Sequence, residues 1–110
     1  MEDCIFCQVI AGKLPSKKAF ENKDIIAFYD INPAADTHIL ICPKKHITSL
    51  NDLNEEHGKL LVEIYQVVQK LVVENSLKLG YYRVLVNGGK AQAVPHLHFH
   101  FLGGKWDKFV

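Results

Sequence analysis

In Pro95-His96-Leu97-His98-Phe99-His100-Phe101-Leu102-Gly103-Gly104, three histidines alternate with large apolar side chains. Side chains two residues apart share one face of a β-strand. We therefore expect a strand over residues 96–102, with its apolar face on a core and its imidazoles facing solvent, a metal or a substrate. The first and third imidazoles would be about 13 Å apart, so we expect different roles for the three rings. The alternative is an edge strand with a merely histidine-rich polar face.

The composition is that of a globular domain, with 48% hydrophobic and 23% charged residues in 110. We expect one domain over residues 1–110. The net charge is +1 without a block of like charge, which argues against a nucleic-acid or membrane partner. The chain shows neither a signal-peptide pattern nor an apolar run of about 18 residues. Three cysteines, an odd number, argue against a disulfide framework and favour a cytoplasmic location.

Two helices and five strands are expected. Residues 4–11 should form a short helix, with Asp3 as its N-cap and Gly12 just after its end. Apolar residues at spacings of three and four predict one long helix over residues 55–79, followed by Gly80 as a C-cap. The predicted strands are residues 19–21, 25–29, 37–42, 82–86 and 96–102. Without a βαβ rhythm, this order predicts an α+β fold, in which a five-stranded, mainly antiparallel sheet carries the long helix on one face.

Cys4 and Cys7 form a Cys-x-x-Cys pair within the short predicted helix. Residues three apart lie on one helical face, so both thiolates can bind one metal ion. A closed tetrahedral zinc site needs two further ligands, for which the sequence offers His46 and His96. A redox-active pair and two small buried side chains are the alternatives.

Several single polar residues are candidates for a binding site. Asp30 follows the apolar strand 25–29, where a carboxylate can accept hydrogen bonds from ribose hydroxyls or simply form a turn. Asn87 precedes two glycines and can offer its amide to a phosphate or serve as a turn residue. His38 lies within a strand, where a histidine is usually a core or interface residue. His57, near the start of the long helix, is expected to face solvent.

Residues 37–46, Thr-His-Ile-Leu-Ile-Cys-Pro-Lys-Lys-His, followed by the histidines at 96, 98 and 100, resemble the histidine triad (HIT) family. The short chain and residues 101–104 are similar to its Hint branch, and the resemblance runs over residues 4–104. It implies a HIT-like fold and a homodimer with one continuous sheet. It also implies hydrolysis at the α-phosphate of purine nucleoside 5′-phosphoramidates, such as those of adenosine or guanosine monophosphate.

The resemblance also implies roles for single residues. His98 matches the nucleophile that forms a nucleotidyl-histidine, which water then hydrolyses. His100 would bind the phosphate oxygens, and His38 would assist proton movement. The other positions that match nucleotide-binding residues are an acid at the ribose, amides near the phosphate and apolar residues around the base: Asp30, Asn87, Gln92, Phe6, Val9, Phe28, Tyr29 and Ile31.

In zinc-containing relatives, the first histidine of the motif joins a Cys-x-x-Cys pair and one more histidine around the ion. The resemblance therefore implies a structural zinc on four residues of this chain: Cys4, Cys7, His46 and His96. Many Hint proteins lack this zinc, so membership of the branch does not require it.

The chain departs from the Hint pattern just before the triad. Residues 91–95 read Ala-Gln-Ala-Val-Pro, where the branch usually has Gly-Gln-Ser-Val-aromatic. Ala93 therefore lacks the hydroxyl that touches the leaving group in the family, and the loop after Asn87 looks shorter than usual. These departures bear on efficiency and leaving-group preference more than on the reaction class.

Three other functions remain open on the sequence. The first is a dinucleoside polyphosphate hydrolase or nucleotidyl transferase of the same superfamily. The second is a nucleotide-binding or scaffold module that does not turn over its ligand. The third is a metal-binding protein in which the histidine triad itself is the ligand cluster.

Overall fold

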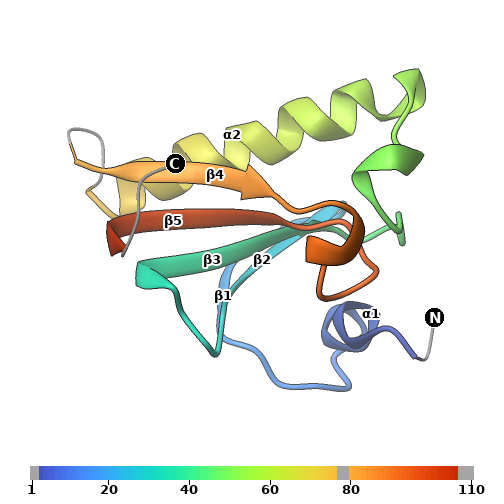
Figure 1. Cartoon of the computed structure of the whole chain (residues 1–110), viewed down its shortest axis with the longest axis horizontal. Coiled ribbons are helices and arrows are strands. Elements are labelled where there is room, and N and C mark those ends of the chain that lie inside the picture. Colours follow the sequence, from blue (N-terminus) through green and yellow to red (C-terminus); the bar gives the residue numbers. More distant parts are fainter. Residues whose placement is uncertain (1–2, 77–79, 107–110) are drawn as a thin grey trace.

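A computed structural model describes residues 3–76 and 80–106, which form one antiparallel sheet with a helix on each face (Figure 1). The order of the strands in the sheet is β1-β2-β3-β5-β4, and every neighbouring pair is antiparallel. The predicted α+β architecture is confirmed. The elements are α1 (Ile5–Ile10), β1 (Lys18–Glu21), β2 (Ile25–Tyr29), β3 (Ala35–Pro43), α2 (Gly58–Glu74), β4 (Tyr82–Val86) and β5 (Phe99–Trp106).

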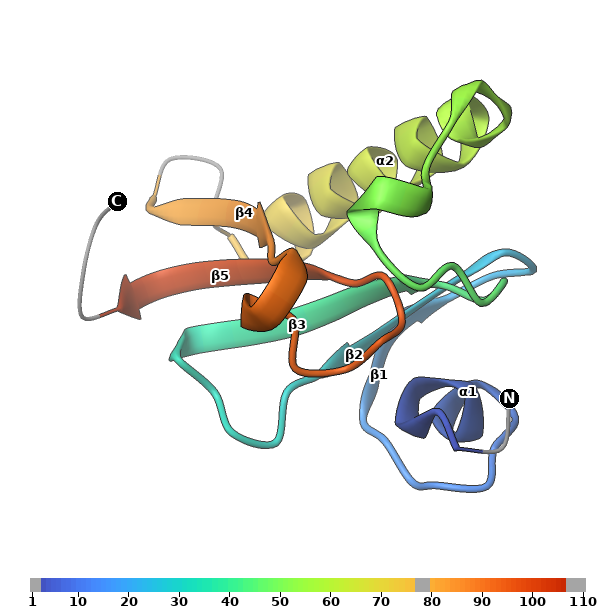
Figure 2. The same cartoon turned by 45° about the vertical axis from the view of Figure 1, so that its right-hand side comes forward.

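The long helix α2 crosses one face of the sheet, and the short helix α1 lies against the other (Figures 1 and 2). Because side chains alternate along a strand, β2 and β3 supply both faces with apolar groups. Toward α1 point Ile26, Phe28, Leu40 and Cys42, which pack with Phe6 and Val9 of the helix. A sheet covered on both faces explains why these strands read as continuous apolar runs instead of alternating with polar residues.

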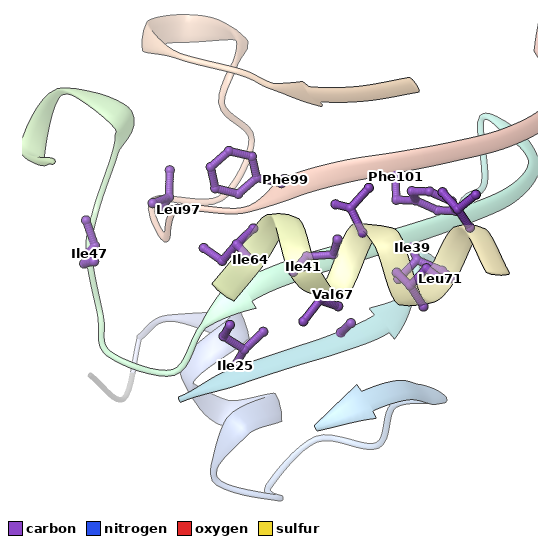
Figure 3. Close-up of a cluster of buried hydrophobic side chains, with 13 residues drawn as sticks. Ile25, Ile39, Ile41, Ile47, Ile64, Val67, Leu71, Leu97, Phe99 and Phe101 are labelled. Carbon is purple, nitrogen blue, oxygen red and sulfur yellow. The ribbon is translucent and has the colours of Figure 1, made fainter. Parts of the chain in front are cut away.

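The larger core lies between the sheet and α2 (Figure 3). The helix buries a stripe at spacings of three and four, formed by Ile64, Val67, Val68, Leu71 and Val72. This stripe packs on Phe99 and Phe101 of β5, and Ile64 and Phe101 are both fully buried. Each such side chain contributes about 1.5–3 kcal/mol of transfer free energy, which anchors β5 to α2. Within the described residues, no helix combines the length and hydropathy that would span a bilayer.

The predicted bounds of the long helix are wrong at both ends. Residues 55–57 form a separate 3₁₀ turn, and α2 begins at Gly58. At the other end, the side chain of Asn75 donates to the carbonyl of Leu71 at 2.8 Å, and Asn75 rather than Gly80 is the C-cap. Asparagine competes for main-chain partners in this way and so ends helices. The rest of the predicted helix, residues 77–79, lies outside the described residues.

Two predictions about single residues are also wrong. The N-cap of α1 is Cys4 and not Asp3, since the Cys4 thiol accepts a hydrogen bond from the N–H of Cys7 at 3.4 Å. His57 is buried instead of solvent-facing, and its Nδ1 accepts from the N–H of Asn54 at 3.0 Å. Gly12 follows α1 with φ of +79°, as its predicted place after the helix requires.

β5 begins at Phe99 and not at residue 96. The N–H of Leu97 donates to the carbonyl of Ile47 at 2.6 Å, so this part of the chain bonds to a loop and not to a neighbouring strand. The alternation of side chains nevertheless holds, because Leu97 lies in the core beneath α2. Further along, a Cβ at Gly104 would lie 2.7 Å from the Asp36 carboxylate, and its φ is +79°, so only glycine suits this position.

Candidate functional site

The three triad histidines lie on the α1 side of the sheet but face different surroundings. His98 and His100 line a cavity, and their ring centroids are 5.0 Å apart. His96 is fully buried beside two cysteines. Phe6 of α1 packs edge-on to His98, with ring centroids 4.9 Å apart. His98 and His100 can therefore contact one ligand in the cavity together, whereas the His96 imidazole cannot.

The cavity has a volume of about 520 Å³, within the range typical of small-molecule sites. Its walls are mostly apolar, and its polar groups gather around Asp30 and the two histidines. It is lined by Ile5, Phe6, Val9, Leu14, Pro15, Ser16, Phe28, Tyr29, Asp30, Ile31, Asn32, Leu40, Ala93, Val94, His98 and His100. This division suits a ligand that has a flat apolar part and an anionic part.

The sequence reasoning identified about half of this lining. Phe6, Val9, Phe28, Tyr29 and Ile31 all line the cavity, as does Asp30. The turn formed by residues 14–16 was missed, although it follows the short helix that carries two of the predicted residues. Leu40 was missed too, yet it shares a strand face with His38 at a spacing of two, which is a signal that the sequence contains.

His98 has one ring nitrogen fixed and one free. Its Nδ1 donates to the carbonyl of His96 at 2.7 Å, because a carbonyl can only accept. Burial lowers the pKa of His98, so the neutral ring, with its lone pair on Nε2, is the form present at neutral pH. A neutral imidazole with an oriented lone pair at the wall of a cavity can act as a nucleophile.

His38 and His100 form a hydrogen-bonded pair next to the cavity. The Nε2 of His38 lies 2.9 Å from the Nδ1 of His100 and 3.5 Å from a carboxylate oxygen of Asp30. Burial, followed by the neighbouring His98 and His38, lowers the pKa of His100 to about 4. Burial also lowers the pKa of His38, and Asp30 opposes this shift. Both rings are therefore neutral at pH 7, and one donates a hydrogen bond to the other.

The two predicted amide residues differ in where they lie. The Asn87 side chain reaches His100, with its Nδ2 3.5 Å from the imidazole Nε2. The Gln92 side chain is not part of the cavity wall. Its Nε2 donates to the carbonyls of Thr48 at 2.6 Å and Val94 at 2.9 Å, so it ties the loop before β5 to the chain after β3.

A second cluster, made of Cys4, Cys7, His46 and His96, can hold a metal ion, since its four donor atoms all lie within 4.8 Å of one another. The Cys7 thiol is 3.2 Å from the Nδ1 of His46 and 3.5 Å from the Nδ1 of His96, and Cys4 is also 3.5 Å from His96. A tetrahedral zinc site with standard bond lengths has sulfur–nitrogen separations of about 3.6 Å, so the donors fit zinc.

His96 is also held for this role by a contact outside the cluster. Its Nε2 lies 2.8 Å from the carbonyl of Pro43 and must donate to it, which leaves the Nδ1 lone pair facing the two thiols. Such outer contacts orient metal-binding histidines. Among the described residues, no cluster of metal-binding donors contains more than one of the three triad histidines. The triad itself is therefore not arranged around one ion.

A further hollow, of about 380 Å³, lies at the start of α2 on the other side of the molecule. Its charged lining mixes both signs: Lys23, Lys44, Lys45, Lys59, Asp24, Glu56 and Glu63. Nearly balanced charge gives this hollow little preference for an anion. The histidine-lined cavity is therefore the better candidate for chemistry.

Comparison with known proteins agrees with this geometry. The model of a family described as scavenger mRNA decapping enzyme C-term binding matches residues 3–108. Protein HitA of Neisseria gonorrhoeae is 38% identical over 94% of this chain and 97% of its own. The crystal structure of a HIT family hydrolase from Legionella pneumophila Philadelphia 1 is 42% identical, covers 94% of each chain and has a TM-score of 0.89. A histidine triad protein from Clostridium difficile, 38% identical, covers 100% of this chain and 97% of its own, with a TM-score of 0.93. The chain belongs to the histidine triad (HIT) family.

Proposed function

We propose that this protein is a HIT hydrolase of the Hint type that cleaves purine nucleoside 5′-phosphoramidates through His98. The observation that carries the proposal is the free Nε2 of His98, which is oriented by the bond from Nδ1 to the His96 carbonyl and lies at the polar end of an apolar cavity. Membership of the family supports it, as does a similar protein called a HIT family hydrolase.

In the first step, the His98 Nε2 lone pair attacks the α-phosphorus and the phosphorus–nitrogen bond of the substrate breaks. The amine leaves with the bonding electrons and takes up one proton from solvent. Water then attacks the nucleotidyl-histidine, the electron pair returns to His98, and one proton is released. The products are a nucleoside monophosphate and ammonia, and splitting the displacement in two lowers each barrier.

The remaining polar groups of the site suit a nucleotide. Asp30 accepts from the N–H of Asn32 at 2.8 Å with one oxygen, so its other oxygen can accept from a ribose hydroxyl. The apolar wall, including Phe6 and Ile31, would cover the base. Asn87 would donate to the phosphate. Gln92 could reach a nucleotide only through its Oε1, because its amide nitrogen already binds two carbonyls.

We further propose that Cys4, Cys7, His46 and His96 bind one structural zinc ion. When bound, zinc would supply a crosslink between α1, the chain after β3 and the segment before β5. Because all four ligands come from the protein, the site leaves no open position for a water molecule. The three free cysteines fit a reducing, cytoplasmic compartment.

A homodimer with a continuous sheet would form at the β4 edge. The sheet has two edge strands, and β1 is protected by a Lys18–Glu21 ion pair and a register shift. In contrast, β4 begins with a Tyr82 that is 44% exposed, and α2 exposes Val62 and Val73. An open strand edge and exposed apolar side chains both favour pairing with a second copy.

The test is incubation with adenosine 5′-phosphoramidate and, separately, with diadenosine polyphosphates, with products followed by mass spectrometry. The proposal expects rapid release of adenosine monophosphate from the phosphoramidate and slower cleavage of the dinucleotides. Faster cleavage of the dinucleotides would favour the polyphosphate hydrolase. Tight binding of adenosine monophosphate without turnover of either substrate would favour a binding module.

A further inference from the structure

A main-chain amide in the β2–β3 loop contacts the catalytic histidines. The N–H of Ala34 donates to the Nδ1 of His38 at 3.0 Å. A main-chain amide can only donate, so Nδ1 of His38 is the acceptor. The neutral ring must then carry its proton on Nε2.

The tautomer of His38 determines the tautomer of His100, to which it is hydrogen-bonded. The Nε2 of His38 lies 2.9 Å from the Nδ1 of His100, so His38 donates and His100 accepts. His100 in turn must carry its own proton on Nε2. Each hydrogen bond in this series, from Ala34 to His38 and from His38 to His100, has its donor fixed by the Ala34 N–H, because a main-chain N–H can only donate.

The Nε2–H of His100, the last group in this series of hydrogen bonds, lies next to a second donor. The Nδ2 of Asn87 lies 3.5 Å from the Nε2 of His100, and with these tautomers both groups donate. Two N–H groups this close suit one anionic oxygen that accepts from both. The same tautomers argue against a metal ion on Asp30, His38 and His100, although their donor atoms lie within 4.8 Å of one another. The His38 Nε2 has no lone pair to offer.

We propose that the N–H of Ala34 is a positioning group that fixes the tautomers of His38 and His100, so that His100 and Asn87 together donate to one non-bridging phosphate oxygen. The identity of the anion rests on the proposed function. The tautomers do not, because they follow from protein contacts alone.

The loop around Ala34 holds the amide in place. The N–H of Asn32 donates to a carboxylate oxygen of Asp30 at 2.8 Å, and the N–H of Asp30 donates to the carbonyl of His38 at 2.9 Å. Pro33 restricts the backbone just before Ala34. The Ala34 side chain is itself exposed, so the amide can be altered there without disturbing the core.

The amide can be removed in two ways. Ala34→Pro removes the N–H, and replacement of Ala34 by lactic acid changes the amide to an ester with almost the same shape. Ala34→Gly keeps the N–H and is the matched control. The ester variant decides the question if the proline variant does not fold.

The tautomers are read directly from the imidazole nitrogen chemical shifts in ¹⁵N-labelled protein at pH 7.5, before any ligand is added. We expect the wild type and Ala34→Gly to carry protons on Nε2 of both His38 and His100. In the ester variant, both rings should shift toward the Nδ1–H form, while His98 keeps its proton on Nδ1. Binding of adenosine monophosphate and kcat/KM for the phosphoramidate should each fall about three- to tenfold, the ratio expected for one net hydrogen bond.

A wild-type His100 protonated on Nδ1 would overturn the assignment, as would unchanged tautomers in a folded ester variant. Loss of activity in Ala34→Gly equal to that in the ester variant would also overturn it, because the loop shape and not the amide would then matter. Absence of turnover in a wild type that shows the expected tautomers would overturn the proposed hydrolase function and support the tautomer assignment.

Discussion

His98 and His96 stand two residues apart, on the same face of the chain, yet they have opposite free nitrogens. His98 uses Nδ1 to bind a carbonyl and leaves Nε2 free, whereas His96 uses Nε2 and leaves Nδ1 free. The first arrangement presents a lone pair to the cavity, and the second presents one to two thiols. The sequence pattern predicts that the histidines share one face of the strand. The carbonyl that each ring binds determines which of its nitrogens keeps a free lone pair.

Replacement of His98 by Ala should abolish turnover by at least about a thousandfold, because the covalent step is lost. Steady-state kinetics with adenosine 5′-phosphoramidate measure the loss, and circular dichroism checks that the fold survives. His57→Gln, which alters a buried histidine at the start of α2, is the control and should keep kcat/KM within about twofold. A His98→Ala protein with more than a tenth of the wild-type rate would contradict the assigned nucleophile.

The stability of the protein should depend on the protonation of His100. Burial, His98 and His38 hold its pKa at about 4, whereas a histidine in the unfolded chain titrates near 6.5. Between these values the unfolded chain binds a proton that the folded chain does not, so the free energy of unfolding rises with pH. This stabilisation is fully present above about pH 6.5 and is lost as the pH falls toward 4.

Urea unfolding between pH 4.5 and 7.5, with EDTA throughout, measures this dependence. The wild type should lose stability more steeply on acidification than His100→Asn, which has no imidazole at this position. Parallel curves for the two proteins would show that His100 does not titrate as its burial implies.

At the scale of the elements, α1 connects the cysteine cluster with the cavity. Cys4 and Cys7 lie at its start, and Phe6 between them packs on both His96 and His98. Burial, and then the neighbouring Cys4, raise the pKa of the Cys7 thiol. A metal ion must therefore displace a proton from Cys7, which makes binding weaker in acid.

Cys4→Ser should reduce bound zinc from about one to below about 0.2 per chain and lower stability by at least about 2 kcal/mol, or roughly 8–16 °C in Tm. Activity per folded molecule should fall less than stability does. For His98→Ala we expect the opposite, a large loss of activity with little loss of stability. Cys42→Ala is the control, since this third cysteine is buried outside the cluster of donor atoms. Elemental analysis and thermal melts in the presence and absence of EDTA give the result. Zinc-free wild type that is fully stable and active would leave Cys4 and Cys7 as small core residues.

The elements were predictable from sequence where one local signal dominated. The strands at residues 25–29 and 82–86 match β2 and β4, because β-branched and aromatic runs there end in turn residues. The long helix was predicted too far in both directions, since its ends are set by Asn75 and by a 3₁₀ turn and not by its apolar period. The start of β5 was missed because the partner of Leu97 is a loop carbonyl 50 residues away in the chain.

The site was predictable in part for the same reason. Histidine alternation singled out His98 and His100, but only the resemblance to the histidine triad family put them in one site with Asp30; all three line one cavity. The turn at residues 14–16 could not be placed without knowing how α1 docks on the sheet. Nor could Gln92, whose partners at Thr48 and Val94 come from two different loops.

For the whole molecule, the open edge of β4 predicts a homodimer. Light scattering at micromolar concentration should give about twice the single-chain mass of 12.5 kDa. Tyr82→Lys should shift the mass toward that of one chain, because a charge on an edge strand opposes pairing. Lys18→Ala, at the opposite edge of the sheet, is the control and should stay dimeric. A wild-type mass near 12.5 kDa would contradict the proposed dimer.

In the proposed mechanism, His98 carries the nucleotide during turnover. Rapid acid-free quenching of the protein with adenosine 5′-phosphoramidate, followed by peptide mass spectrometry, detects this intermediate. We expect an adenylyl group on the peptide that contains residues 96–100, located on His98 by fragmentation and absent from His98→Ala. An adduct on His100, or adenosine monophosphate release without any covalent adduct, would contradict it.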